Sequence, residues 1–367
     1  MNESGIVRSR MHNLRLTGER IRTPVEAIRH LVAVQSQDYG PAKWSLAQRV
    51  DGMSDAGLDV AFDEGSFLRT HVLRPTWHFV LPEDIRWLLD LTAPKVRRTM
   101  AYYDRRLGLD ATVMKKAVGR IVKALESEGQ MTRKELADVI EGSGIEARGQ
   151  RLNHIVMNAE LVSAICSGGL RGKQQTYALL DERAPARPRM SHDEILGELI
   201  RRYFTSHGPA TAKDLRWWAS LTLSEIKRGI EIAGSSLESE MVDGRTYWYA
   251  PGSNAPAIRS PRVDLLQGYD EFIVGYSDSK FLLDMSGTIP KPTASQRVVY
   301  NGVLLVDGQV AGHWKRTLGK SLVIEVVAYR RLSATQTKAL EREGRRLGRF
   351  LGLEPMIRTS LIPGRRR

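Results

Sequence analysis

Two glutamines separated by one serine, Gln35-Ser36-Gln37, end an apolar segment near the start of the sequence. Two amide oxygens can hold one water molecule, because each oxygen carries two acceptor lone pairs. Glutamine is too weak a base to activate water against a poor leaving group, so the bond to be broken must already have a good one. An N7- or N3-alkylated purine qualifies. Its ring is cationic and departs with the glycosidic electrons, leaving an oxocarbenium-like sugar that a positioned water captures.

Two other interpretations of the glutamines stay open on spacing alone. They can be core residues whose amides satisfy nearby backbone groups, because a buried amide without a partner costs about 1–3 kcal/mol. Asp38 directly follows the pair and is a rival general base. The residue types therefore predict a held water, a packed amide pair or a carboxylate base.

The backbone must bring the two amides to one side for them to share a target. A helix start signal lies at Thr23-Pro24 and a stop signal at Gly40-Pro41, so we expect a helix between them with Gln35 on its buried face. On a regular helix, residues i and i+2 point about 200° apart, which would separate Gln35 from Gln37. Convergence therefore requires the helix to end early and the chain to become extended at Gln35, since alternate side chains of a strand share a face.

Composition restricts the partners and the compartment. The chain of 367 residues has 55 Lys and Arg against 42 Asp and Glu, a net charge of +13, which favours nucleic acid over an anionic membrane surface. Cys166 is the only cysteine, which excludes intrachain disulfides and cysteine-rich zinc or iron–sulfur sites. We find no apolar signal region and no stretch of the roughly 18 apolar residues that span a membrane, and so we expect a cytoplasmic protein without membrane association.

An internal repeat organises the middle of the chain. GQMTRKEL begins at Gly129 and GPATAKDL at Gly208, an offset of 79 residues. We expect each copy to cap a helix at Thr132 or Thr211, to continue through a second helix (149–165 and 222–233), and to end in a β-hairpin. Helix, turn, helix and hairpin is the order of a winged-helix unit, which can place a helix in the major groove and a wing against phosphates.

The remaining segments complete the predicted domain organisation. LRPTWHFVL follows the helices of residues 23–70 and suggests a third, diverged copy at the front. The fold class we predict is α+β, with three tandem winged-helix units followed by a β-rich hairpin region (260–331) and a terminal helix (333–352). The predicted domains are 1–110, which carries the glutamines, 111–185, 186–258, and a β-rich region with a basic helix at 259–367; residues 182–190 are the clearest linker.

Four segments together resemble a known family: VQSQDYGPAKWSL, FLRTHVLRPTWHFV, LLQGYDEFIVGY and NGVLLVDGQVAGHWKRT. The chain resembles, over about 10–355, the AlkZ-like winged-helix DNA glycosylases of bacteria, which unhook interstrand cross-links and excise bulky alkyl-purine adducts. The resemblance implies that Gln35 and Gln37 form the family's catalytic Gln-x-Gln motif, which positions the water. It also implies the branch that includes self-resistance enzymes of producers of azinomycin-, trioxacarcin- or hedamycin-like DNA alkylators.

Further residues are assigned to DNA by the same resemblance. Arg74, Thr76, Trp77 and His78 match the motif on the first wing and are expected beside the DNA near the glutamines, although Trp77 fits a core position equally well. Lys315 and Arg316 are expected to bind phosphates. No residue resembles a lyase amine, so we expect a monofunctional glycosylase, a monomer without metal or other cofactor, acting on double-stranded DNA with alkyl-purine adducts or cross-links.

The fold alone allows other functions. Tandem winged helices are also typical of a DNA-binding transcriptional regulator without catalysis. An RNA-binding protein is the weaker alternative, because the chain lacks an aromatic-rich platform for single strands. Sequence-independent binding favours repair, whereas tight binding to one undamaged sequence favours regulation.

Overall fold

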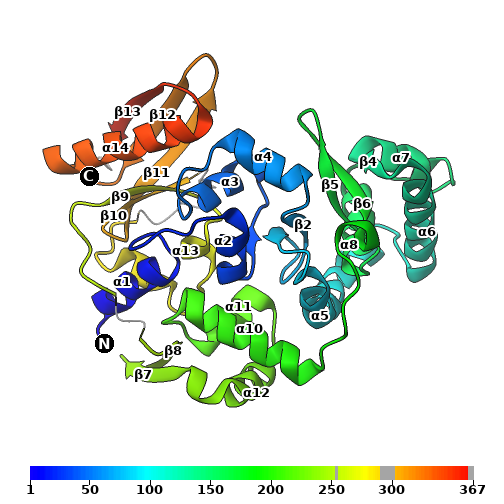
Figure 1. Ribbon diagram of the computed structural model, residues 1–367, viewed down its shortest axis with the longest axis horizontal. Helices are drawn as coiled ribbons and strands as arrows, with labels where there is room; N and C mark the ends of the chain where they lie inside the picture. Colours follow the sequence, from blue (N-terminus) through cyan, green and yellow to red (C-terminus); the bar gives the residue numbers. More distant parts are fainter. Residues whose placement is uncertain (253–254, 290–301, 363–367) are drawn as a thin grey trace.

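One order of elements recurs three times in the computed structural model, which describes residues 1–252, 255–289 and 302–362. A helix is followed by a short strand or bridge, two helices and a β-hairpin (Figure 1). The first occurrence is α2 (Pro24–Leu31), β1 (Val34–Gln35), α3 (Tyr39–Ala47), α4 (Asp55–Asp63), β2 (Leu68–His71) and β3 (Trp77–Val80). The second is α6 (Ala111–Glu128), β4 (Gln130–Thr132), α7 (Arg133–Glu141), α8 (Gly149–Leu161), β5 (Ile165–Arg171) and β6 (Gln174–Leu179). The third is α10 (His192–His207), α11 (Ala212–Ala219), α12 (Leu223–Ala233), β7 (Glu238–Val242) and β8 (Arg245–Tyr249).

The three small sheets share one strand order. The short leading strand pairs with the second strand of the hairpin, giving β1-β3-β2 in the first sheet and β4-β6-β5 in the second. In the third, a single bridge between Ala210 and Trp248 takes the place of the leading strand beside β7 and β8. The predicted mixture of helices and sheets is confirmed, while the winged-helix assignment and the four domain boundaries stay predictions.

The repeated helix starts follow from local capping. The Thr132 hydroxyl accepts from the N–H of Glu135, whose carboxylate accepts from the N–H of Thr132, and Thr211 and Asp214 repeat the arrangement. Such capping boxes satisfy N–H groups that a helix start otherwise leaves without partners. Both predicted caps are confirmed, whereas the helix predicted over 149–165 ends at Leu161.

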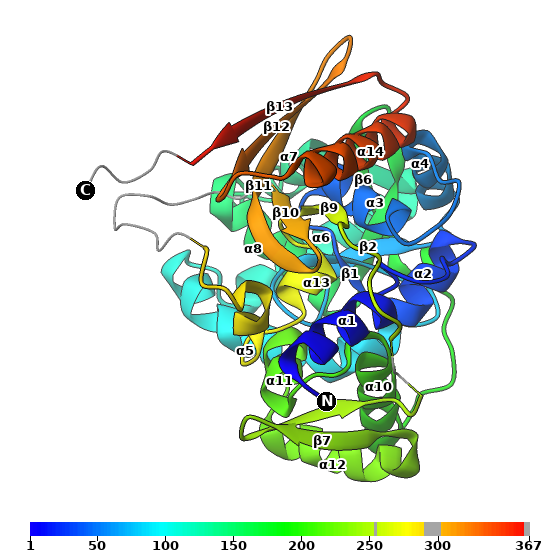
Figure 2. The same cartoon turned by 90° about the vertical axis from the view of Figure 1, so that its left-hand side faces the viewer.

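The C-terminal region is one five-stranded sheet covered by a helix. Its strand order is β13-β12-β11-β10-β9, antiparallel except between β12 and β13. Figure 2 shows α14 lying along this sheet. The helix contacts β9 and β13, and its buried residues include Leu340, Leu347 and Phe350. Parts of the predicted region, residues 290–301 and 363–367, lie outside the described residues. The elements are β9 (Val263–Gln267), α13 (Glu271–Val274), η2 (Lys280–Asp284), β10 (Gly302–Val306), β11 (Gln309–Leu318), β12 (Leu322–Ala328), α14 (Ala334–Leu351) and β13 (Pro355–Leu361).

The remaining helices connect these parts. They are α1 (Glu3–Asn13), α5 (Ile85–Arg106), α9 (Leu180–Arg183) and the short η1 (Gly234–Ser236). The first helix, α1, falls in the predicted domain 1–110 but packs on α10 and η2. Its Arg10 donates to the carbonyl of Pro209 at 2.8 Å and to the Ser279 hydroxyl at 2.6 Å. The N-terminal helix therefore ties the third repeat to the C-terminal region.

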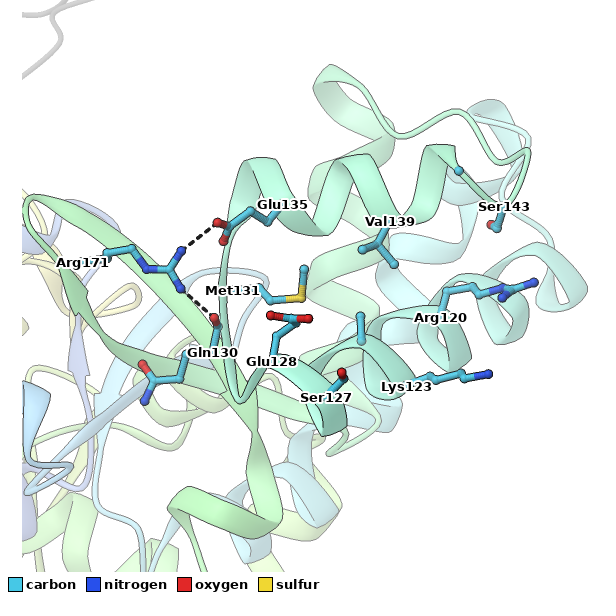
Figure 3. Close-up of a pocket in the computed structure, with 12 residues that line it drawn as sticks. Arg120, Lys123, Ser127, Glu128, Gln130, Met131, Glu135, Val139, Ser143 and Arg171 are labelled. Atoms are coloured by element: carbon cyan, nitrogen blue, oxygen red, sulfur yellow. Dashed lines mark hydrogen bonds and ion pairs between the residues drawn. The ribbon is translucent and has the colours of Figure 1, made fainter.

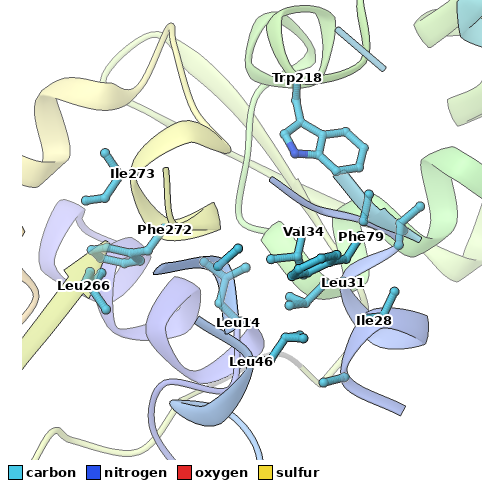
Figure 4. Close-up of a cluster of buried hydrophobic side chains, with 14 of the residues drawn as sticks. Leu14, Ile28, Leu31, Val34, Leu46, Phe79, Trp218, Leu266, Phe272 and Ile273 are labelled. Carbon is cyan, nitrogen blue, oxygen red and sulfur yellow. The ribbon is translucent and has the colours of Figure 1, made fainter. Parts of the chain in front are cut away.

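Buried apolar side chains in the described part of the chain form two clusters. The second repeat has a cluster of its own, from Leu109 to Tyr177, and lies to one side of the molecule in Figure 1. The first repeat, the third repeat and the C-terminal region share the other cluster, in which Val34, Phe79, Trp218 and Phe272 come together (Figure 4). No helix in the described part of the chain is long and apolar enough to cross a membrane.

The helix before the glutamines starts as predicted, with Thr23 as its cap and Pro24 as its first residue, but it ends earlier. The helix α2 already ends at Leu31, and Val32 has a φ of 71°, a rare conformation for a β-branched residue, which turns the chain into β1. The predicted stop at Gly40-Pro41 is wrong, because both residues lie in the first turn of α3. Proline is tolerated there since the first N–H groups of a helix have no intrahelical acceptor.

Candidate active site

The Gln35-Ser36-Gln37 segment runs along the second strand of the first hairpin. In β1, Gln35 lies opposite His78 of β3, and the N–H of Ser36 donates to the carbonyl of Trp77 at 2.7 Å. The extended backbone expected at Gln35 is confirmed. Because the chain stays paired to β3 as far as Ser36, both glutamines lie beside the loop that joins β2 to β3.

One amide oxygen accepts a hydrogen bond from that loop, and the other accepts one from the first residue of β3. The Gln35 Oε1 accepts from Nη2 of Arg74 at 2.6 Å, and the Gln37 Oε1 accepts from the backbone N–H of Trp77 at 3.4 Å. Among residues 1–252, 255–289 and 302–362, neither amide nitrogen has a hydrogen-bond acceptor. The neighbours thus fix the oxygens, and each oxygen keeps a second lone pair for a water.

A buried arginine holds the backbone between the two amides. Arg69 of β2 donates to the carbonyl of Ser36 at 3.0 Å and to that of Gln37 at 3.2 Å. Its guanidinium lies 4.4 Å from the centre of the Trp77 ring. Arg69 therefore fixes the backbone of the glutamine segment to strand β2 of the first hairpin.

A buried carboxylate from the C-terminal region supports Gln35 from behind. Glu271 of α13 is fully buried and accepts from the N–H of Gln35 at 2.8 Å, from Nε1 of Trp218 at 2.8 Å and from Nε2 of His207 at 3.3 Å. Burial by itself raises the pKa of Glu271, but the His207 hydrogen bond and the nearby Arg74 charge outweigh it and hold the pKa at about 2. The carboxylate is therefore ionised beneath the candidate site.

The residue before Glu271 anchors α13 to the first repeat. Asp270 accepts two hydrogen bonds from the Arg49 guanidinium, both at 2.8 Å, and one from the Ser45 hydroxyl at 2.7 Å. A two-pronged guanidinium–carboxylate pair fixes orientation as well as distance. Together, Asp270 and Glu271 tie the C-terminal region to α3 and to β1.

The histidines of the first hairpin are inside the protein. His78 is fully buried, with Nδ1 2.9 Å from the carbonyl of Thr76, and burial together with the Arg74 charge lowers its pKa to about 3. His78 has no exposed surface in this structure, and its DNA contact stays a prediction. His71 is bonded to the buried Glu160, and its ring lies 4.2 Å from that of Trp77.

A groove of about 790 Å³ opens in front of Gln35. It brings together three predicted site residues, Gln35, Arg74 and Thr76, whereas Gln37, Trp77 and His78 are not part of its wall. The Thr76 hydroxyl is buried and has no hydrogen-bond partner in the described chain. The other residues of the wall come from α11 and its C-cap, from the segment 269–278 and from the hairpin loop: Lys213, Arg216, Trp217, Ser220, Tyr269, Val274, Ser277, Asp278 and Pro75.

Lys315 and Arg316 of β11 lie in a separate hollow of about 200 Å³, which Asp38 also lines. Lys315 is exposed and pairs with Glu325 at 3.1 Å, whereas burial lowers the pKa of Arg316. The structure thus brings Asp38 beside these two cations rather than into the groove of Gln35.

Another hollow, of about 700 Å³, lies on the second repeat and contains none of the predicted site residues. Figure 3 shows Arg171 directed toward Glu135 and Gln130, at 2.7 Å from the carboxylate and 2.8 Å from the Gln130 carbonyl. Its wall shares no residue with the groove of Gln35, so we assign it no function.

Sequence reasoning missed the residues that support the glutamines. Glu271 stands in the quoted segment LLQGYDEFIVGY, where a carboxylate beside a purely apolar run was a usable signal for a buried, paired charge. Arg69 gave a similar signal within FLRTHV. The sequence around Trp217 gave no signal of a functional role, because two adjacent tryptophans on a helix are typical of a buried core.

Comparison with known proteins agrees with this architecture. Residues 28–350 match the family model for DNA glycosylase AlkZ-like proteins, so the chain belongs to the AlkZ-like DNA glycosylase family. It is similar to an interstrand DNA cross-link repair glycosylase of Streptomyces sahachiroi, with 21% identity over 341 residues, 89% of this chain and 91% of that protein. The solved structure of the Streptomyces sahachiroi DNA glycosylase AlkZ has the same fold, with a TM-score of 0.79 at 20% identity over 98% of this chain and 99% of that one.

Proposed function

We propose that this protein is a monofunctional DNA glycosylase that hydrolyses the N-glycosidic bond of cationic N7- or N3-alkylated purines in duplex DNA. The observation that carries the proposal is the pair of amide oxygens held by Arg74 and by the backbone of Trp77, with Gln35 at the wall of an open groove. Bulky adducts and interstrand cross-links are the proposed substrates, in repair or in self-resistance to a DNA-alkylating product. The similarity to a cross-link repair glycosylase supports this choice.

The proposed reaction uses the amides as water ligands. The glycosidic bond breaks, and its electron pair neutralises the cationic purine, which leaves. A water on the free lone pairs of Gln35 and Gln37 adds to C1′ of the oxocarbenium-like sugar and loses a proton to solvent. The ionised Glu271, buried behind Gln35, holds the backbone of Gln35 and offsets the charge of Arg74 at the groove wall.

A monofunctional reaction is supported by the state of the groove lysine. Lys213 lines the groove, but its ammonium group lies 3.8 Å from the carboxylate of Asp278. An amine held by a carboxylate is not positioned as a nucleophile, so the expected product is an intact strand with an abasic site.

The remaining proposals concern the fold, the compartment and the DNA contacts. We propose that the three repeats are winged-helix units, that the domains follow the predicted boundaries, and that the protein acts as a cytoplasmic monomer. The excess of positive charge supports binding to the DNA backbone. Arg74 contributes mainly by holding Gln35, and Lys315 and Arg316 remain the proposed phosphate ligands.

The test is to incubate the protein with duplex DNA that contains one N7-alkylguanine and to identify the products. We expect free alkylated base, a strand that breaks only after alkali treatment, and no covalent complex after borohydride reduction. Binding to undamaged duplexes should not depend on sequence. Tight binding to one undamaged sequence without base release would instead make the protein a regulator.

A further inference from the structure

The groove of Gln35 has an aromatic wall that the proposed hydrolysis does not use. Two consecutive tryptophans of α11 differ completely in burial: Trp218 is fully buried and bonds to Glu271, whereas Trp217 is 53% exposed. Tyr269, which follows β9, is 39% exposed and lines the same groove. Large aromatic surface left in water at a concave site is typical of a binding surface.

The charges around Trp217 define what can bind there. The Arg74 guanidinium, which holds the Gln35 oxygen, lies 5.9 Å from the centre of the Trp217 ring. Arg216 is exposed on the same helix and has no ion pair or hydrogen bond in the described part of the chain. Aromatic side chains next to unpaired cations are the combination with which proteins bind nucleotides, through stacking on the ring and attraction of the phosphate.

We propose that Trp217 and Tyr269 form a stacking surface for a planar ring of the alkylated nucleotide, with Arg216 binding a flanking phosphate. This inference rests on the proposed function and adds a determinant of substrate choice to it. A cationic N7-alkylpurine is favoured over a neutral base, because the face of a tryptophan ring attracts positive charge. The ring that stacks is either the purine itself or an aromatic group on the alkyl substituent.

The experiment compares Trp217→Ala and Trp217→Phe with the unmodified protein on two matched duplexes. One duplex carries N7-methylguanine, and the other carries an N7-guanine adduct with a polycyclic aromatic substituent. Single-turnover base release and affinity for adducted and undamaged duplex are measured. Tyr102→Ala is the control, because Tyr102 is equally exposed, at 54%, but lies on α5 outside the groove.

We expect Trp217→Ala to lose roughly ten- to a hundredfold in release and in preference for adducted duplex, and Trp217→Phe to keep most of both. Loss on both duplexes assigns the stacked ring to the purine, and loss on the bulky adduct alone assigns it to the substituent. Unchanged release and preference in Trp217→Ala would overturn the inference. If the unmodified protein releases no base, the proposed function fails, and the preference for adducted duplex still tests the stacking surface.

Discussion

The carboxylate of Glu271 accepts the backbone N–H of Gln35 at 2.8 Å, although the two residues are 236 positions apart in the chain. The same carboxylate accepts from Trp218, which neighbours the exposed Trp217. One buried charge therefore joins the first repeat, the third repeat and the C-terminal region behind the candidate site. The position of Gln35 is a property of the whole fold.

Replacing Glu271 with glutamine should weaken both stability and base release. The substituted amide would present N–H groups toward the donors of Trp218 and His207 and leave Arg74 without its buried counter-charge. We expect a loss of about 3 kcal/mol in the free energy of unfolding, measured by urea titration. Glu231→Gln, on the exposed face of α12, is the control and should change neither quantity. A stable, fully active Glu271→Gln variant would contradict the supporting role of Glu271.

Arg74→Lys should slow base release and leave DNA affinity nearly unchanged. Lysine cannot reach both the Gln35 oxygen and the carbonyl of Trp218, which Arg74 binds at 2.6 and 3.3 Å. A lost hydrogen bond from a charged group corresponds to roughly a ten- to hundredfold slower step. Single-turnover rates and equilibrium binding separate the two effects. Weaker DNA binding with an unchanged rate of base release would indicate that Arg74 contacts DNA directly.

Stability should fall as the pH drops below 6.5. Burial lowers the pKa of His78 to about 3 and that of His30 to about 4, so between pH 6.5 and 4 the unfolded chain binds protons that the folded protein excludes. In this range, each unit by which the pH falls lowers the free energy of unfolding by about 1.4 kcal/mol for each of these histidines. Urea unfolding at pH 6.5, 5.5 and 4.5 measures the slope. His30→Gln should make it shallower, the exposed His192→Gln should not, and an identical slope in both variants would refute the assignment.

Lys315→Ala should weaken binding to every duplex by the same factor. Lys315 is exposed on β11 and pairs with a half-buried Glu325, which suits a phosphate contact. The dependence of log affinity on log salt concentration should become shallower by about one. Lys134→Ala, at an exposed lysine of α7, is the comparison. A loss confined to one DNA sequence would indicate base recognition instead.

The features that sequence predicted correctly are local ones. The caps at Thr132 and Thr211 depend on residues three positions apart, and the extended chain at Gln35 followed from the requirement that alternate side chains share a side. The element order could be read because each repeat carries its own turn and capping residues.

The features that sequence missed depend on contacts between distant segments. Nothing near Glu271 indicates that its partner is the N–H of Gln35, and nothing near His78 indicates that β1 and its surroundings bury it completely. The stop predicted at Gly40-Pro41 failed because proline is as acceptable in a first helical turn as after a last one. These outcomes are set by tertiary packing, which one sequence does not encode in local spacing.

The most direct test of the central claim is the single-turnover rate of N7-alkylguanine release by Gln35→Ala, Gln37→Ala and Asp38→Asn, with DNA affinity measured in parallel. Asp38 is the adjacent control, since it is exposed and lines the hollow of Lys315 and not the groove of Gln35. The account predicts that both glutamine variants lose release by a hundredfold or more, on the order of one positioned catalytic group, with affinity retained and Asp38→Asn near the unmodified rate. Full release by both glutamine variants, or a collapse in Asp38→Asn alone, would contradict it.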